Sequence, residues 1–312
     1  MTVVPRSVPP HELWRADGDD LVVHGDNLPV LRALPDGAFR LVYLDPPFNS
    51  GRTQTRQSVK NIRSPHGTRI GFQGRSYETV KGRALSYADR FDDYWGFLEP
   101  RLAEAHRLLA DDGLLFLHLD AGEVHYARVA LDALFGADAF VNEIVWAYDY
   151  GARSKRRWPA KHDNLLVYAR TPGAHRFDEE AVARESYPAP GMPPGVEGEP
   201  SDVWWHTIVS TTGREKTGYP TQKPVGILRR IVQAATDPGD WVLDPFAGSG
   251  TTGAVAQHLD RRFVLVDSSD DAIEVMHRRL GAGILGAETS FLALDGPRST
   301  SIPEIPESAT SA

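Results

Sequence analysis

Short apolar runs alternate with longer amphipathic stretches along most of the chain. The runs DLVVH (20–24), RLVYL (40–44) and LLFLHLD (114–120) show little polar alternation, which predicts strands covered on both faces. Residues 93–110 repeat apolar positions every three or four residues, which predicts an amphipathic helix. Further strands are expected at 142–148, 164–169, 241–244 and 262–267, and further helices at 122–135, at 223–236, from Thr251 and at 269–280. Strands alternating with helices indicate an α/β protein, with a parallel sheet and helices on both faces.

The pattern is weak at both ends of the chain and at two places inside it. We expect an N-terminal tail at 1–16, a single domain at 17–285 and a mostly disordered C-terminal tail at 286–312. Within the domain, 51–88 is rich in Gly, Arg and Ser without a sustained period, which predicts a long basic loop or insertion. The segment 171–218 is short and includes a Pro/Gly-rich loop.

Composition narrows the class of protein. The chain has 312 residues, of which 41% are hydrophobic and 24% charged, and it contains no cysteine. Disulfides and thiolate metal sites are therefore excluded. The first residues lack the apolar core of a signal peptide, and no apolar run is long enough to span a bilayer. We therefore expect a cytoplasmic protein that does not interact with a membrane.

The segment WVLDPFAGSGTTG reads as strand, glycine turn and helix. Gly248, Gly250 and Gly253 satisfy G-x-G-x-x-G, and Asp267 ends the next strand, where a carboxylate can bind a ribose diol. This pattern fits either a nicotinamide dinucleotide or S-adenosylmethionine. Asp244 precedes the glycines, and an anion there suits a cofactor with an amino group and a sulfonium better than a pyrophosphate. The alternative is that Asp244 only caps the turn.

The segment LVYLDPPFNS ends an apolar strand on a carboxylate followed by two prolines. Pro46 and Pro47 remove two N–H donors, so the Asp45 carboxylate and the Pro46 carbonyl can both accept the hydrogens of an exocyclic amino group. Phe48 offers a face for stacking a base, worth roughly 1–3 kcal/mol. If the strands before Asp45 and Asp244 are neighbours, their carboxylates flank one crevice. The alternative is a proline-rich turn.

DPPF and DPFAGSGTT together resemble the amino-directed DNA methyltransferases. The DPPF motif precedes the glycine motif here, and YPTQKP (219–224) lies just before the glycine strand. This order is similar to that of the β-class of bacterial N6-adenine or N4-cytosine DNA methyltransferases, over roughly residues 20–285. The resemblance implies a Rossmann-like S-adenosylmethionine methyltransferase sheet, circularly permuted, in the domain at 17–285.

The resemblance also implies roles for individual residues. Those that hold and stack the target base are Asp45, Pro46, Pro47 and Phe48. Those that bind the cofactor are Asp26, Thr221, Gln222, Lys223, Asp244, Phe246, Ala247, Gly248, Ser249, Gly250, Thr251, Thr252 and Asp267. No metal is implied. Relatives often have Glu at the ribose-binding position, so Asp267 is a mild departure.

The implied activity is methyl transfer from S-adenosylmethionine to the exocyclic N6 of adenine in duplex DNA, after the base is flipped out. DPPF rather than SPPY favours adenine, with N4-cytosine as the alternative and RNA or protein amino groups as less favoured substrates. A dinucleotide-dependent oxidoreductase would have no need of DPPF or TQKP. A silent DNA-binding subunit would be expected to lose Asp45 or the glycines, and all are present.

Basic residues gather in two places on a chain whose net charge is −8. The residues expected to contact DNA phosphates are Arg52, Arg56 and Lys60 in the first cluster and Arg153, Lys155, Arg156, Arg157 and Lys161 in the second. Because 171–218 is short, sequence recognition is expected from the 51–88 insertion, from a second subunit or from a partner. The sequence leaves open whether the protein forms a homodimer or works with a restriction or specificity partner.

Overall fold

A computed structural model describes residues 5–49, 52–63, 69–70, 76–89, 91, 93–148, 154–184, 201–210, 213–280 and 289–294. Between residues 52 and 89 it describes the backbone alone. The Pro/Gly-rich loop expected at 186–200 lies outside the described residues.

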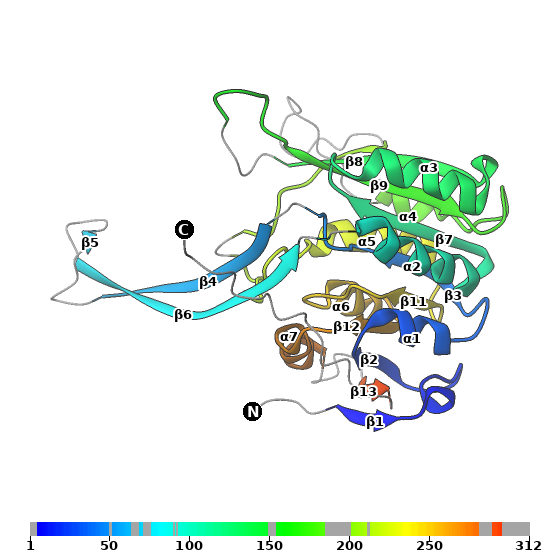
Figure 1. Ribbon diagram of the computed structural model, residues 1–312, viewed down its shortest axis with the longest axis horizontal. Helices are drawn as coiled ribbons and strands as arrows, with labels where there is room; N and C mark the ends of the chain where they lie inside the picture. Colours follow the sequence, from blue (N-terminus) through cyan, green and yellow to red (C-terminus); the bar gives the residue numbers. More distant parts are fainter. Residues whose placement is uncertain are drawn as a thin grey trace, which may run out of the picture.

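A ten-stranded sheet forms the centre of the molecule, in the order β1-β13-β2-β12-β11-β3-β7-β9-β8-β10 (Figure 1). Its strands are β1 (Arg6–Val8), β2 (Asp20–His24), β3 (Phe39–Leu44), β7 (Leu109–Leu119), β8 (Phe140–Ala147), β9 (His162–Ala169), β10 (Val203–Trp205), β11 (Trp241–Asp244), β12 (Arg262–Asp267) and β13 (Thr289–Leu294). Neighbouring strands are parallel except where β9 pairs antiparallel with β7 and β8. The expected parallel sheet is therefore interrupted at β9, since strand direction depends on pairing rather than on local pattern.

Helices cover both faces of this sheet, as the sequence predicted. One face carries α1 (Asn27–Ala33), α2 (Tyr94–Leu108) and α3 (Val124–Phe135), and the other carries α5 (Val225–Ala235), α6 (Thr251–His258) and α7 (Asp270–Leu280), with α4 (Glu179–Arg184) beside α5. Short 3-10 turns occur at η1 (Pro10–Glu12) and η3 (Ala137–Ala139). Successive residues of β3 alternate between the faces: Val42 and Leu44 enter one core, Leu41 and Tyr43 the other.

Two short strands from within the expected tails at 1–16 and 286–312 take part in the sheet, and the remaining residues 1–4, 286–288 and 295–312 lie outside the described part. Strand β13 pairs with β2, and β1 pairs with β13. Leu13 and Leu292 are buried in the core, and the Trp14 ring lies 5.3 Å from that of Trp241. For 5–16 and 289–294 the tail prediction was wrong, because each strand is too short to be stable alone and is stabilised by a distant neighbour.

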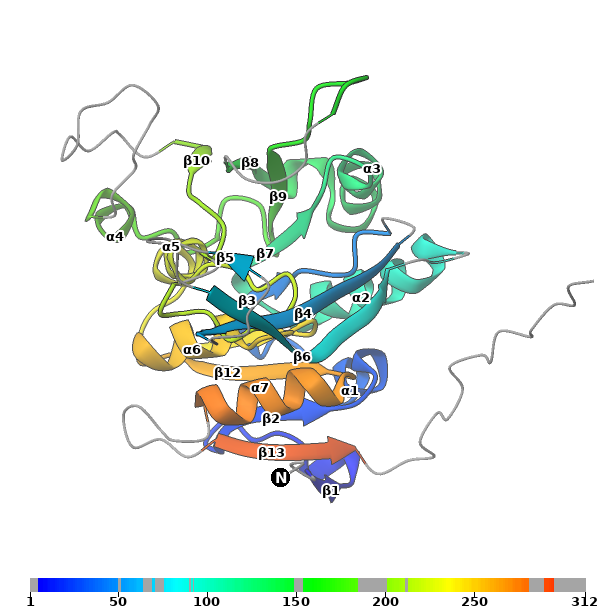
Figure 2. The ribbon, with the colours of Figure 1, turned by 90° about the vertical axis from the view of Figure 1, so that its left-hand side faces the viewer.

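The segment 51–88 was expected to be a long basic loop or insertion, and the described part of it forms an antiparallel ribbon. Strand β4 (Arg52–Arg63) pairs along its length with β6 (Ser76–Asp89), and β5 (Arg69–Ile70) adds two residues to β6. Cross-strand hydrogen bonds satisfy the backbone without needing a hydrophobic period in the sequence. The ribbon projects from the main sheet in Figure 1 and crosses in front of it in Figure 2. It begins close behind the DPPF segment.

Candidate active site

Three neighbouring strands end on acidic residues or directly before one. Asp267 ends β12, Asp244 ends β11, and Asp45 follows β3. Strand β11 pairs with β12 on one side and with β3 on the other, all parallel. Adjacent strands lie about 4.8 Å apart, so the three carboxyl groups come to one edge of the sheet. The strands of Asp45 and Asp244 are therefore neighbours, which was the condition for their carboxylates to flank one crevice.

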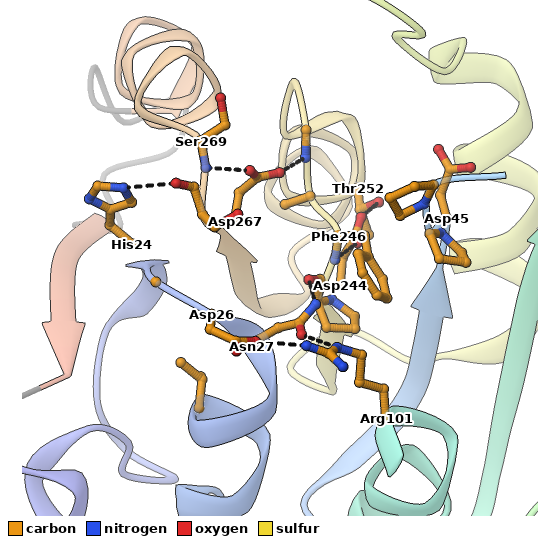
Figure 3. Close-up of a pocket in the computed structure, with 18 of the residues that line it drawn as sticks. His24, Asp26, Asn27, Asp45, Arg101, Asp244, Phe246, Thr252, Asp267 and Ser269 are labelled. Carbon is orange, nitrogen blue, oxygen red and sulfur yellow. Dashed lines mark hydrogen bonds and ion pairs between the residues drawn. The ribbon is translucent and has the colours of Figure 1, made fainter. Parts of the chain in front are cut away.

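A cleft of about 1430 Å³ lies over these strand ends (Figure 3). Every residue assigned from the sequence to the base or the cofactor lines it, except Gly250. Small-molecule sites commonly measure about 300–1,000 Å³. The cleft is therefore large enough for a cofactor and a second group beside it.

The glycine turn brings backbone close to the cleft. Gly248 and Gly250 have φ of 49° and 70°, a region that favours glycine. An added Cβ would lie 3.2 Å from Tyr219 at Gly248, and 2.7 Å from Met276 at Gly250. At Gly253 in α6 it would lie 2.5 Å from Leu265, so this glycine permits close packing of helix on strand. Such a turn before a helix N-terminus suits a bound nucleoside cofactor.

Asp244 is buried at the floor of the cleft. Its carboxylate accepts hydrogen bonds from the Thr252 hydroxyl at 2.5 Å and the Phe246 backbone N–H at 3.0 Å. Burial raises the pKa of Asp244 to about 7 against the lowering effect of these hydrogen bonds, and the nearby carboxylates of Asp45 and Asp267 add to the rise. A buried carboxylate of this kind gains from a cationic ligand.

Asp267 uses both carboxylate oxygens to shape the loop above it. One accepts from the Gly248 N–H at 2.8 Å and the other from the Ser269 N–H at 2.8 Å (Figure 3). Burial raises its pKa, while these N–H groups act in the opposite direction. Each oxygen has further lone-pair capacity, so the carboxylate can also accept ligand hydroxyls.

Asp26 belongs to a charged cluster that the sequence did not reveal. It caps α1 and pairs with Arg101 at 2.8 Å. Arg101 donates to Asn27 at 2.5 Å, and Asn27 donates to the Pro245 carbonyl at 2.7 Å. The Arg101 guanidinium also lies 3.8 Å from the centre of the Phe97 ring. A buried arginine in α2 thus braces the loop behind Asp244, and its charge within an amphipathic helix was the available signal.

Asp45 meets Lys223 across the cleft. The Asp45 Oδ1 lies 2.8 Å from the Lys223 Nζ, and the two side chains are 16% and 11% exposed. The same ammonium lies 4.7 Å from the centre of the Phe48 ring. Between Asp45 and Phe48 in the chain, Pro46 is buried and Pro47 is half-buried. The sequence placed Lys223 near the cofactor, whereas the structure directs its ammonium to the acid of DPPF.

Thr221 and Gln222 hold the segment that carries Lys223. Thr221 has a φ of 54°, and the Gln222 amide is committed within the protein. Its oxygen accepts from the N–H and the hydroxyl of Thr217, each at 2.8 Å, and its nitrogen donates to the Glu215 carbonyl at 2.7 Å. Gln222 therefore fixes the turn rather than directing its amide at a ligand.

A buried polar network lies under Phe48, and the sequence analysis missed it. Tyr43 Oη lies 2.8 Å from His118 Nδ1, and His118 Nε2 lies 3.2 Å from Asp163, which also accepts from Tyr148 at 3.0 Å. The His118 ring lies 5.8 Å from that of Phe48. Burial raises the pKa of Tyr43 well above its usual range, and the nearby Asp45 adds to this. The histidine inside the apolar run LLFLHL was the signal.

The residues expected to contact DNA fall on two segments. Arg52, Arg56 and Lys60 lie on β4, whose side chains are outside the described part, and Arg153 lies outside the described residues altogether. Lys155, Arg156 and Arg157 are exposed and Lys161 is half-buried, in the segment between β8 and β9. Trp158 beside them is 96% exposed.

Both segments follow strands that end at the same edge of the sheet. Strands β3 and β7 are parallel, and β8 runs in their direction because each of β7 and β8 is antiparallel to β9. The segment after β8 and the ribbon after β3 thus leave from the edge that holds the cleft. Figure 1 shows both on one side of the molecule.

The described residues contain no group of three or more histidine or acidic side chains placed to hold a metal ion. None of their helices is long and apolar enough to cross a membrane.

The part of the chain that holds the cleft, the glycine turn and the DPPF segment matches a known protein family. The model of the N6_N4_Mtase family, described as DNA methylase, matches residues 39–278. The chain belongs to this family of DNA methylases. The methylase is 28% identical over 271 residues to the DNA adenine methyltransferase YhdJ of Escherichia coli strain K12, covering 83% of this chain and 82% of YhdJ. It is 26% identical over 273 residues to the type II methyltransferase M.HpaI of Haemophilus parainfluenzae, covering 87% and 77%.

Solved structures agree with this fold. The methylase resembles the M1.HpyAVI–SAM complex with a TM-score of 0.53 and 20% identity, over 83% of this chain and 98% of that one. It resembles the cytosine-N4-specific PvuII DNA methyltransferase with a TM-score of 0.54 and 15% identity, over 88% and 95%. The methylase is therefore an S-adenosylmethionine-dependent DNA methyltransferase with an α/β methyltransferase sheet.

Proposed function

We propose that this methylase transfers a methyl group to the N6 amino group of adenine in duplex DNA. The observation that carries the proposal is the placement of Asp45 and Asp244 at the ends of adjacent parallel strands, over one cleft. One carboxylate then serves the target amino group and the other a cationic cofactor. The name of YhdJ, a DNA adenine methyltransferase, supports adenine as the base.

Asp45, Pro46 and Phe48 form the proposed base pocket. The Asp45 carboxylate and the Pro46 carbonyl accept the two hydrogens of the amino group. These hydrogen bonds withdraw the nitrogen lone pair from ring conjugation and direct it toward the methyl group to be transferred. Phe48 stacks on the base. Because an amino group in a base pair is not accessible, the base enters this pocket only when it is flipped from the duplex.

The proposed cofactor pocket lies on the other side of Asp244. In it Asp244 faces the α-amino group, Asp267 faces the ribose hydroxyls, and the Gly248–Gly250 turn allows close approach of the chain. Asp26 closes the far end of the cleft, where the adenine of the cofactor would lie. The raised pKa of Asp244 means that a cationic ligand would bind with release of a proton near neutral pH.

Catalysis by these residues consists of positioning and electrostatics. When bound, S-adenosylmethionine would supply a methyl group on a sulfonium, a leaving group that keeps the electron pair of the S–C bond. Asp45 and Pro46 would hold the amino nitrogen so that its lone pair faces this methyl group. One hydrogen of the amino group leaves as a proton along the hydrogen bond to Asp45.

The ribbon β4–β6 and the basic segment after β8 form the proposed DNA-facing side. Both leave the sheet at the cleft edge, and Lys155, Arg156 and Arg157 are exposed there. We propose that the DNA sequence is recognised by the ribbon, by a second subunit of a homodimer or by a specificity partner. We also infer that the sheet is circularly permuted, because DPPF precedes the glycine motif in the sequence.

The test is mass spectrometry of nucleosides from mixed-sequence duplex DNA incubated with methyl-labelled S-adenosylmethionine. Wild-type protein should yield labelled N6-methyladenine, and Asp45→Ala should reduce the yield at least a hundredfold while cofactor binding is retained. Asp26→Ala is the matched control, because it removes a cleft carboxylate on the cofactor side and should weaken cofactor binding instead.

Three outcomes contradict parts of the proposal. Labelled N4-methylcytosine would keep the pocket and replace the base. Near-normal turnover by Asp45→Ala would remove Asp45 from the mechanism. Label in RNA but not in duplex DNA, with both substrates offered, would overturn the assignment to duplex DNA.

A further inference from the structure

Lys223 contacts both groups that the proposed pocket reserves for the target base. Its Nζ lies 2.8 Å from Asp45 Oδ1, the distance at which an amino group would donate to the same carboxylate. It also lies 4.7 Å from the centre of the Phe48 ring, within the range of a cation–π contact. A base stacked on Phe48 and bonded to Asp45 would need the volume that this ammonium fills.

The backbone of Lys223 cannot withdraw easily, because its neighbours fix it. The Lys223 carbonyl accepts from the Thr251 hydroxyl at 3.1 Å, which ties it to the start of α6. Gln222 is bonded on both sides of its amide, and Pro224 has a fixed φ before α5. The ammonium can therefore leave Asp45 only by rotation of the four-carbon side chain.

A second anion is within electrostatic range of Lys223. Asp163 lies on β9 and holds His118 and Tyr148 by hydrogen bonds. Burial tends to raise the pKa of Asp163, but His118 and the positive charge of Lys223 outweigh it, so the pKa is lowered. An ammonium displaced from Asp45 thus keeps a favourable anionic neighbour rather than becoming an unpaired buried charge.

We propose that Lys223 is a placeholder for the target base: its ammonium occupies the amino-group position beside Asp45 and Phe48 until an amino-bearing base displaces it toward Asp163. The proposal rests on the proposed function, which assigns Asp45 and Phe48 to the base. It makes Lys223 a specificity-determining residue. A base without an exocyclic amino group cannot replace the lost donor, so Asp45 would be left buried without a partner.

Nucleoside binding tests this directly, with S-adenosylhomocysteine at saturation so that the cofactor site is filled. Adenosine is the probe, and inosine, which lacks the amino group, is its control. Lys223→Met removes the competing ammonium and should tighten adenosine binding about tenfold, since the competent fraction of the pocket rises. Inosine should remain the weaker ligand in wild type and in Lys223→Met, because it offers no amino hydrogen to Asp45 in either protein. Lys223→Arg keeps a cation and should bind adenosine as weakly as wild type.

The expected pattern depends on Asp45 as the shared acceptor. Asp45→Asn alone should not tighten adenosine binding, and in Asp45→Asn/Lys223→Met the gain from the lysine change should disappear. Retained binding of S-adenosylhomocysteine verifies that each variant is folded. Should Lys223→Met fail that check, Lys223→Gln replaces it with the same expectation.

The outcomes separate this inference from the function beneath it. Unchanged or weaker adenosine binding in a folded Lys223→Met or Lys223→Gln overturns the placeholder, even if wild type methylates DNA. A loss of S-adenosylhomocysteine binding in both variants would instead make Lys223 a cofactor residue. If wild type does not methylate DNA and adenosine affinity is the same in Asp45→Asn as in wild type, the proposed function itself is contradicted.

Discussion

Replacing Asp244 by asparagine should stabilise the cofactor-free protein and make its stability less dependent on pH. The substitution keeps the size of the side chain and removes a buried carboxylate. The asparagine oxygen can still accept from the Phe246 N–H, as Asp244 does at 3.0 Å. The change therefore tests the cost of the buried charge rather than a loss of packing.

The magnitude follows from the pKa of Asp244. Burial raises it to about 7, from an ordinary value of 3.8. At about 1.36 kcal/mol for each pKa unit, the ionised form costs roughly 4 kcal/mol relative to the unfolded chain. The folded state binds the proton of Asp244 more tightly than the unfolded chain does. The stability gained from this proton binding is fully present below about pH 4 and is lost as the pH rises through about 7.

Thermal unfolding between about pH 5 and pH 8, without cofactor, measures the effect. Asp244→Asn should unfold roughly 3 °C higher than wild type at about pH 5 and roughly 8 °C higher at about pH 8, since wild type has already lost about 1.7 kcal/mol at the lower pH. Asp17→Asn is the control, because its carboxylate is 80% exposed, and it should follow the wild-type profile. A variant no more stable than wild type at pH 8, or equally stabilised at both pH values, would refute the reasoning.

The same substitution should act in the opposite direction on the proposed cofactor site. Wild-type affinity for S-adenosylmethionine should rise from about pH 6 to pH 8, because the cationic cofactor binds the ionised carboxylate. Asp244→Asn should bind the cofactor more weakly and with a flatter pH profile. Calorimetry in two buffers of different ionisation enthalpy would detect the released proton. Equal pH profiles for the two proteins would contradict this role of Asp244.

Two further predictions concern the glycine turn and the basic segment. Gly250→Ala should lower the free energy of unfolding in urea by roughly 2–4 kcal/mol, because the φ of 70° is retained while the new methyl group meets Met276. Gly37→Ala is the control, with a φ of 65° and no contact closer than 4.0 Å, and it should lower the free energy of unfolding by only about 1 kcal/mol. Equal losses in the two variants would show that the contact with Met276 is relieved. Arg156→Glu/Arg157→Glu should weaken duplex binding about tenfold or more and lower its salt slope by about two, with cofactor affinity kept. Arg15→Glu, near the opposite ends of the strands, should change neither quantity, and an unchanged slope in the double variant would remove these arginines from the DNA interface.

Local pattern was sufficient for most of the elements. The strand at 20–24 and the strand at 262–267 have the bounds that the apolar runs gave, and the helix expected at 93–110 begins and ends within two residues of α2. The glycine turn could also be predicted from the sequence, because the positive φ at Gly250 and the close helix–strand contact at Gly253 both favour glycine.

Pairing of distant segments required the tertiary structure. The sequence supplied two acids at the ends of two strands and the condition that these strands be neighbours, and the register of β11 against β3 met that condition. It did not supply the antiparallel β9, the ribbon of β4 and β6, or the addition of β1 and β13 to the sheet edge. Each depends on hydrogen bonds between separate strands, some close and some distant in sequence, and these bonds leave no periodic trace in either strand.

The chemistry of the cleft divides in the same way. The sequence by itself determined which side chains could serve a base and a cofactor, because Asp45, Phe48 and Asp244 stand in short motifs whose residue types restrict the chemistry. Only the tertiary structure decided that Lys223 pairs with Asp45 and that Arg101 supports Asp26. A buried charge must find a partner wherever the fold places one, and that partner is fixed by distance in space rather than along the chain.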